Sequence, residues 1–173
     1  MNKHFFYLTI LLFIISGCHT ADRKMMNIEG AISSDHNEQI IYLVPRPHPI
    51  PETVDSAYIT NGTFSFSIPA DSSIYDITIS RRANAYVQRL LIIAEEGTLH
   101  VNMGANSSGT GTPLNNQLQH WKELMETAGE KAALLSQEIN KHKGNDTITA
   151  TLKKQRESIY ESFGDSTFCF IKQ

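Results

Sequence analysis

The spacing of apolar residues changes once along the chain, close to residue 114, and this change constrains the fold more than any other feature. Between residues 27 and 103, apolar residues alternate with polar ones in short runs that turn residues separate. From Leu114 onward, they recur at alternating intervals of three and four. Period two is typical of half-buried strands, and the longer period is typical of amphipathic helices. We therefore expect a mainly β fold: a small antiparallel β-sandwich of about seven strands over 26–105, then a helical C-terminal region over 106–173.

The clearest strand pattern surrounds Asn61-Gly62, a dipeptide that favours a type I′ hairpin turn. Residues 63–68 after the turn alternate strictly between apolar and polar, and the run before the turn is the expected hairpin partner. The segment 39–44, which is apolar after Gln39, and the apolar run 90–93 predict central strands that are covered on both faces. The helices that follow are candidates for that cover.

A stripe of apolar residues predicts a helix of about 28 residues that begins at Thr112-Pro113 and ends before Gly144. A second helix is expected from about Asp146, and the two should form a helical hairpin. The stripe permits packing on the sheet, on the second helix or across a homodimer, and we favour packing within one chain. Its members are Leu118, Trp121, Met125, Ala128, Ala132, Leu135 and Ile139.

The amino terminus has the pattern of an export signal. Lys3 is followed closely by the uncharged run 5–15, which is too short to cross a bilayer as a helix. The run ends in Ile15, Ser16 and Gly17 before Cys18, and this order resembles the bacterial lipobox. The resemblance implies cleavage before Cys18 and transfer of a diacylglycerol to its sulfur. The alternative is an ordinary secretory signal with an incidental cysteine.

The lipobox divides the amino-terminal part into a signal peptide over 1–17 and a lipidated tether over 18–25. Two or three acyl chains on Cys18 would hold the protein on a membrane firmly. No hydrophobic stretch of transmembrane length follows Cys18. His19 stands where an aspartate would resemble an inner-membrane retention signal, so we expect the periplasmic face of the outer membrane.

The segment 45–52 has a proline at every second position, which is too many missing N–H donors for a central strand. It is predicted to be a loop or a strand edge. A stiff extended loop that exposes Arg46 and His48 is a candidate binding surface, because such a loop loses little entropy on binding. The alternative is a plain connection or protection of a sheet edge.

Composition excludes several function classes. Fifteen lysines and arginines against 18 acidic residues give a net charge of −3, and no basic block could bind nucleic acid. The seven histidines have no metal-ligand spacing, and no catalytic motif is present, so we expect no metal, no cofactor and no enzyme activity. The glycine-rich stretch 106–113 lacks a phosphate-binding motif and is interpreted as a flexible connection to the long helix.

Cys169 is the one thiol left once Cys18 is lipidated. It is a candidate for a redox or intermolecular thiol. The alternative is burial between Phe168 and Phe170.

Several segments together resemble a Bacteroidota lipoprotein domain, the domain of unknown function numbered 4369. The opening strands are similar, as are the hairpin around Asn61-Gly62, the turn at Glu96-Gly97 and the motif 110–121 that leads into the helix. The likeness covers about residues 26–163. In the family this domain commonly precedes a thioredoxin-like domain with a WCxxC dithiol, which this sequence lacks.

The resemblance carries over no catalytic residue, because the dithiol has no matching positions. We therefore expect a lipid-anchored, non-catalytic β module of the cell envelope that binds a periplasmic protein or an envelope ligand. The alternative is a truncated or split thioredoxin-like thiol-disulfide oxidoreductase that lacks its catalytic CxxC domain.

Overall fold

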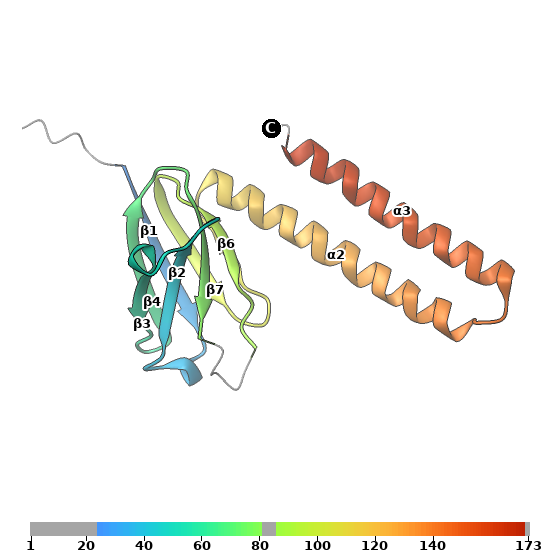
Figure 1. The fold of residues 1–173 in the computed structure, drawn as a ribbon, viewed down its shortest axis with the longest axis horizontal. Helices are drawn as coiled ribbons and strands as arrows, with labels where there is room; N and C mark the ends of the chain where they lie inside the picture. The colour runs from blue at the N-terminus through green and yellow to red at the C-terminus, as the bar shows by residue number, and fades with distance from the viewer. Residues whose placement is uncertain (1–23, 81–85, 172–173) are drawn as a thin grey trace, which may run out of the picture.

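The computed structural model describes residues 24–80 and 86–171; the side chains of residues 166 and 168–171 also lie outside the described part. Two four-stranded sheets pack face to face, and a helical hairpin extends from one end of them (Figure 1). The predicted fold class is confirmed, with eight strands in the described residues instead of about seven. Sheet A has the order β4-β1-β7-β8, and sheet B has the order β3-β2-β5-β6. The strands are β1 (Met25–Ile32), β2 (Ile40–Pro45), β3 (Asp55–Tyr58), β4 (Thr63–Pro69), β5 (Ile74–Ile79), β6 (Leu90–Ile93), β7 (Gly97–Met103) and β8 (Ser108–Thr110).

The alternating residues of the strands build one core between the sheets. On β4 the predicted face is correct, because Phe64, Phe66 and Ile68 are buried while the residues between them are exposed. Gly30 on β1 lies opposite Phe64, and a Cβ there would meet the Phe64 ring at 2.0 Å, so the ring packs directly on the glycine backbone. The most buried members of the core are Met26, Ile28, Ile41, Leu43, Ile77 and Leu99.

The turn at Asn61-Gly62 joins the two sheets and does not form the long hairpin that we expected. Both residues have positive φ, as a type I′ turn requires, but the pairing stops after one bridge between Thr60 and Thr63. Strand β3 then pairs with β2 in sheet B, whereas β4 pairs with β1 in sheet A. The buried Ile59 lies just before the turn, so the chain crosses the core layer at this corner.

Two further features differ from the sequence-based expectation. Strands β1 and β7 are parallel, so sheet A is mixed and not purely antiparallel. The run 90–93 forms β6 at the edge of sheet B, so it is not a central strand, whereas β2 is an inner strand as expected. The helices do not cover the outer face of β2, because the first helix, α2 (Pro113–Lys141), contacts β6 and β8 at the sheet edges.

The short strand β8 lies within the glycine-rich stretch that we expected to be a flexible connection. It pairs with β7, and the N–H of its Gly109 donates to the Gln119 side chain at 3.2 Å. Gln119 belongs to α2, and another residue of α2, Asn115, binds the edge of β6. Asn115 accepts a hydrogen bond from the Ile93 N–H at 2.9 Å and donates to the Ile93 carbonyl at 2.8 Å. The first turns of the helix are therefore fixed to both sheets.

The long helix α2 (Pro113–Lys141) begins with Thr112 at the N-cap position, as predicted. Thr112 makes no side-chain cap, and Glu95 instead accepts a hydrogen bond from the Leu114 N–H at 2.9 Å. A carboxylate at this end also interacts favourably with the helix dipole. Glu95 thus supplies the cap that the sequence assigned to Thr112.

The helix α3 (Asp146–Ile171) returns along α2, which confirms the predicted hairpin. Trp121 packs against Phe163 with ring centroids 6.2 Å apart, and its indole N–H donates to Thr167 at 3.1 Å. Within the described ranges, no helix is both long enough and apolar enough to cross a membrane.

Candidate functional site

The proline segment after β2 is a loop, as the sequence predicts. Strand β2 ends at Pro45, a short 3-10 helix covers Pro51–Thr53, and β3 then returns beside β2. His48 is exposed, and Ile50 is 54% exposed. The loop crosses the sandwich in front of sheet B in the view of Figure 1. It therefore borders the outer face of sheet B.

Arg46 does not point freely into solvent, because its guanidinium group binds Asp76 on β5. The Arg46 Nε donates to the Asp76 Oδ2 at 2.7 Å, and the Arg46 Nη2 lies 2.6 Å from the same oxygen. The Asp76 side chain is only 7% exposed, so the carboxylate is held below the loop. The hydrogen bond to Asp76 and the charge of Asp76 raise the pKa of Arg46, so the guanidinium stays protonated.

A second guanidinium reaches the same carboxylate oxygen. Arg89, just before β6, places its Nη1 3.3 Å from the Asp76 Oδ2. The side chains of Arg46 and Arg89 are 46% and 54% exposed, so both present N–H groups to solvent. Two cations against one anion leave one excess positive charge at this point.

The three charged residues lie in a depression of about 310 Å³ on the outer face of sheet B. Its remaining walls are Thr78 and the apolar residues Val44, Pro45, Pro47 and Pro49. Small-molecule sites are concave and mostly apolar, with a few polar groups that fix orientation. A guanidinium fork matches the oxygens of a carboxylate or phosphate. The arrangement is therefore suited to holding an anionic group of modest size.

The structure brings Arg46 into this site with two residues that sequence reasoning missed, Asp76 and Arg89. The alternation of β5 marks Asp76 as an outward-facing residue, but no sequence signal shows that it is buried by the loop. His48 is on the same loop but does not line the depression. Of the predicted pair, Arg46 is thus part of the site and His48 lies outside it.

The remaining site predictions fall where side chains are not described. Ile15, Ser16, Gly17 and Cys18 lie outside the described residues. Cys169 lies within α3, but its side chain is outside the described part. These assignments stay predictions. Among the described residues, no cluster of three or more histidine, cysteine or acidic side chains could hold a metal ion.

Comparison with known proteins gives one match. A family model described as "Domain of unknown function (DUF4369)" matches residues 26–118. The match covers all eight strands apart from Met25 and ends in the second turn of α2, three residues after Asn115. No curated protein and no solved structure matches the chain significantly. Because the model covers more than half of the chain, this protein belongs to the DUF4369 family.

Proposed function

We propose that this protein is a lipid-anchored, non-catalytic module of the cell envelope that binds an anionic group of a protein or envelope ligand. The anchor is Cys18, and the proposed position is the periplasmic face of the outer membrane. The lipobox-like order of residues 15–18 supports the anchor, and His19, in place of the aspartate that resembles an inner-membrane retention signal, supports the outer membrane.

The observation that carries the binding proposal is the pair of half-exposed arginines over one buried carboxylate. Asp76 orients both guanidinium groups but neutralises only one of them. The excess charge lies in the depression described above, where the low-dielectric wall strengthens attraction to an incoming anion. A carboxylate or a phosphate would meet N–H groups that are already fixed in position, so little ordering entropy is lost.

The site favours binding over catalysis. Asp76 already accepts hydrogen bonds from two guanidinium groups, so it is poorly placed to act as a general base. Among the described residues that line the depression, Thr78 contributes the one hydroxyl group. A nucleophile requires an adjacent base with a free lone pair, and this depression offers none among its described residues.

A titration with three small probes tests the proposal. The probes are an acetylated dipeptide with a free carboxyl terminus, the same dipeptide as an amide, and methyl phosphate, and binding is followed by NMR signals of the arginine Nε–H groups. We expect the carboxylate or the phosphate to bind and the amide not to bind. Arg89→Gln should weaken binding at least about tenfold, because it removes a charge-assisted hydrogen-bond donor.

Lys153→Gln is the matched control, because it removes the same charge from an exposed position on α3. Equal binding of the acid and the amide, no response to any probe, or full affinity of Arg89→Gln would each contradict the proposal. The thiol-disulfide alternative predicts instead a mixed disulfide through Cys169 that Cys169→Ser abolishes.

A further inference from the structure

The helical hairpin, meaning α2, α3 and their connecting loop, leaves large apolar side chains exposed. Two helices cannot enclose an apolar stripe, because each helix is covered on one side only. Exposed apolar surface of this kind marks an interaction site more often than a solvated face. The exposed fractions are 62% for Leu134, 54% for Tyr160, 40% for Met125, 39% for Ile148 and 37% for Leu124.

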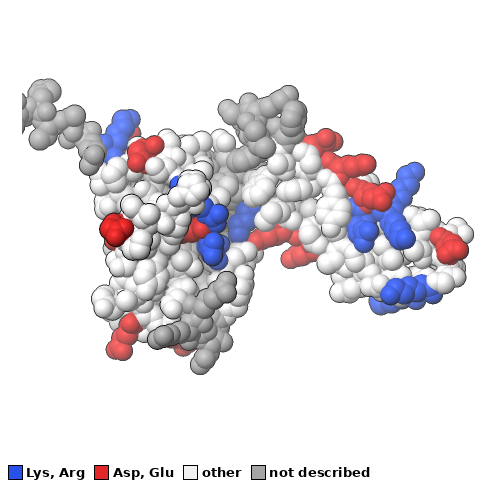
Figure 2. Space-filling view, in the orientation of Figure 1, with Lys and Arg blue, Asp and Glu red and all other residues white. Residues whose placement is uncertain are grey.

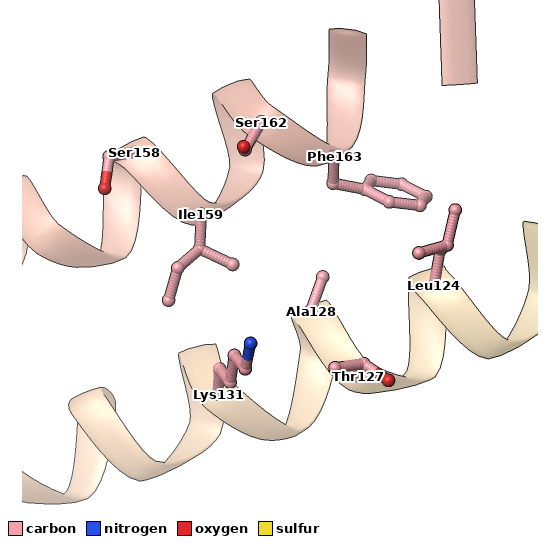
Figure 3. A pocket seen from close by; sticks show the side chains of 8 residues that line it. All are labelled: Leu124, Thr127, Ala128, Lys131, Ser158, Ile159, Ser162 and Phe163. Atoms are coloured by element: carbon pink, nitrogen blue, oxygen red, sulfur yellow. The ribbon is translucent and has the colours of Figure 1, made fainter. Parts of the chain in front are cut away.

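A groove of about 330 Å³ runs between the two helices near the middle of the hairpin. Figure 3 shows Leu124 and Ala128 of α2 facing Ile159 and Phe163 of α3 across this groove, with Lys131 at one end. Of the described residues, those that line the groove all belong to the two helices. The groove is therefore open to a partner that lies along the hairpin.

Charge is divided between the two halves of the hairpin. The half next to the sandwich, residues 113–130 and 158–171, has five acidic residues and one lysine, whereas the outer half, residues 131–157, has six basic residues and three acidic ones. In Figure 2, blue side chains gather over the outer half and red ones dominate nearer the sandwich. The boundary between the halves falls at the groove, which Lys131 and Ser158 both line.

We propose that a second copy of this chain covers the groove, with the two hairpins antiparallel about a two-fold axis that passes through it. A two-fold axis brings the same patch of both copies together, so the patch must be complementary to itself. In the antiparallel arrangement each acidic half faces the basic half of the other copy. A parallel arrangement would place like charges together, which costs free energy.

The hairpin pair would form a four-helix bundle in which the groove residues of both copies are buried. Exposed Leu124 lines the groove, and exposed Leu134 lies beyond Lys131 along α2; both would contact the partner helices. A membrane surface is a poorer occupant, because anionic headgroups would repel the acidic half while attracting the basic half.

Sedimentation velocity of the full-length protein in a non-ionic detergent tests this proposal. The variant Glu130→Lys/Glu161→Lys removes acidic charge, and the variant Lys153→Glu/Lys154→Glu removes basic charge; all four residues are exposed. We expect each double variant to raise the dimer dissociation constant at least about tenfold. Lys153→Glu/Lys154→Glu should weaken the dimer more than Glu130→Lys/Glu161→Lys, because it leaves both halves with net negative charge, whereas Glu130→Lys/Glu161→Lys leaves one half neutral and the other positive. Unchanged helix content by circular dichroism would exclude loss of folding as the cause.

Glu38→Lys/Glu52→Lys on the sandwich is the matched control for net charge and should dimerise like the parent. Leu134→Gln should weaken the dimer without loss of helix content by circular dichroism. A protein that sediments as a monomer at every soluble concentration overturns the proposal. So does a dimer that Lys153→Glu/Lys154→Glu weakens less than Glu130→Lys/Glu161→Lys does. A stronger dimer in Glu130→Lys/Glu161→Lys would indicate parallel hairpins instead.

Discussion

Replacing Asn115 by alanine should detach α2 from the edge of sheet B. Asn115 is 2% exposed and makes three hydrogen bonds, two with the backbone of Ile93 and one of 2.8 Å to the hydroxyl group of Thr112. Each bond contributes about 1 kcal/mol net, and alanine leaves the Ile93 backbone groups without these partners. We expect Asn115→Ala to lower the free energy of unfolding by about 3 kcal/mol.

Urea unfolding, followed by the fluorescence of Trp121 and by far-UV circular dichroism, measures this loss. With a slope of about 2 kcal/mol/M, the midpoint should fall by about 1.5 M. Gln117→Ala is the matched control, because Gln117 is exposed on the same helix and its replacement should change stability by about 0.5 kcal/mol or less. A loss below about 1 kcal/mol for Asn115→Ala would refute the reasoning.

The variant Asn115→Asp adds a test through pH. It keeps the acceptor for the Ile93 N–H but turns a carboxylate oxygen towards the Ile93 carbonyl. Burial without a cation raises the pKa of the new carboxyl group in the folded state above its unfolded value. Its destabilisation should therefore be largest near pH ~7 and should shrink as pH falls towards ~4, where the protonated group can donate. A destabilisation that does not change with pH contradicts this geometry.

Two further predictions concern the core and the joint with the helix. Gly30→Ala should destabilise the protein by about 1–3 kcal/mol, because the added Cβ displaces the Phe64 ring. The control Gly129→Ala, in mid-helix with nothing near the added Cβ, should stabilise the protein by about 0.5–1 kcal/mol. Equal effects of the two variants in urea unfolding would be inconsistent with the packing of Phe64 on Gly30. Burial raises the pKa of Glu126, but hydrogen bonds from Lys122, Gln88 and Asn106 outweigh it and leave the pKa lowered. Glu126 therefore stabilises the folded protein above its unfolded pKa, and this stability is lost as pH falls through its folded pKa. In Glu126→Gln, the free energy of unfolding should fall less steeply as the solution is acidified. An unchanged dependence at acid pH would show that Glu126 does not contribute.

The fold was predictable wherever one apolar face decides the structure. Alternation identified the buried residues of β4 and β7, and helical spacing identified α2 to within a few residues. Strand β8 was missed because its sequence, Ser-Gly-Thr, has no apolar alternation and depends on pairing with β7. The turn at Asn61-Gly62 was identified, but local residues do not specify that β3 and β4 join different sheets.

The edge position of β6 shows the same limit. Leu90 and Ile92 face the core, and Leu91, which is 38% exposed, lies beside α2 on the other face. The run is therefore apolar on both faces although β6 is an edge strand. A run covered by a helix and a run covered by a sheet have the same pattern in the sequence.

The candidate site was predictable only in part, because its residues meet through strand register. Arg46 was identified from the proline loop, but Asp76 and Arg89 are 30 and 43 positions further along the chain. Asp76 is opposite Val44 and Leu91 in the ladders of sheet B, and this register brings both arginines to one carboxylate. No residue spacing within a single segment of the sequence indicates that these three side chains lie together.

The proposal that the protein works while held on a membrane is tested most directly at its amino terminus. The measurement is the mass of the amino-terminal peptide of the protein extracted from membranes of its source cell. We expect a peptide that begins at Cys18 and carries two or three acyl chains. A peptide that contains unmodified Cys18, or one that retains residues 1–17, would contradict lipid anchoring.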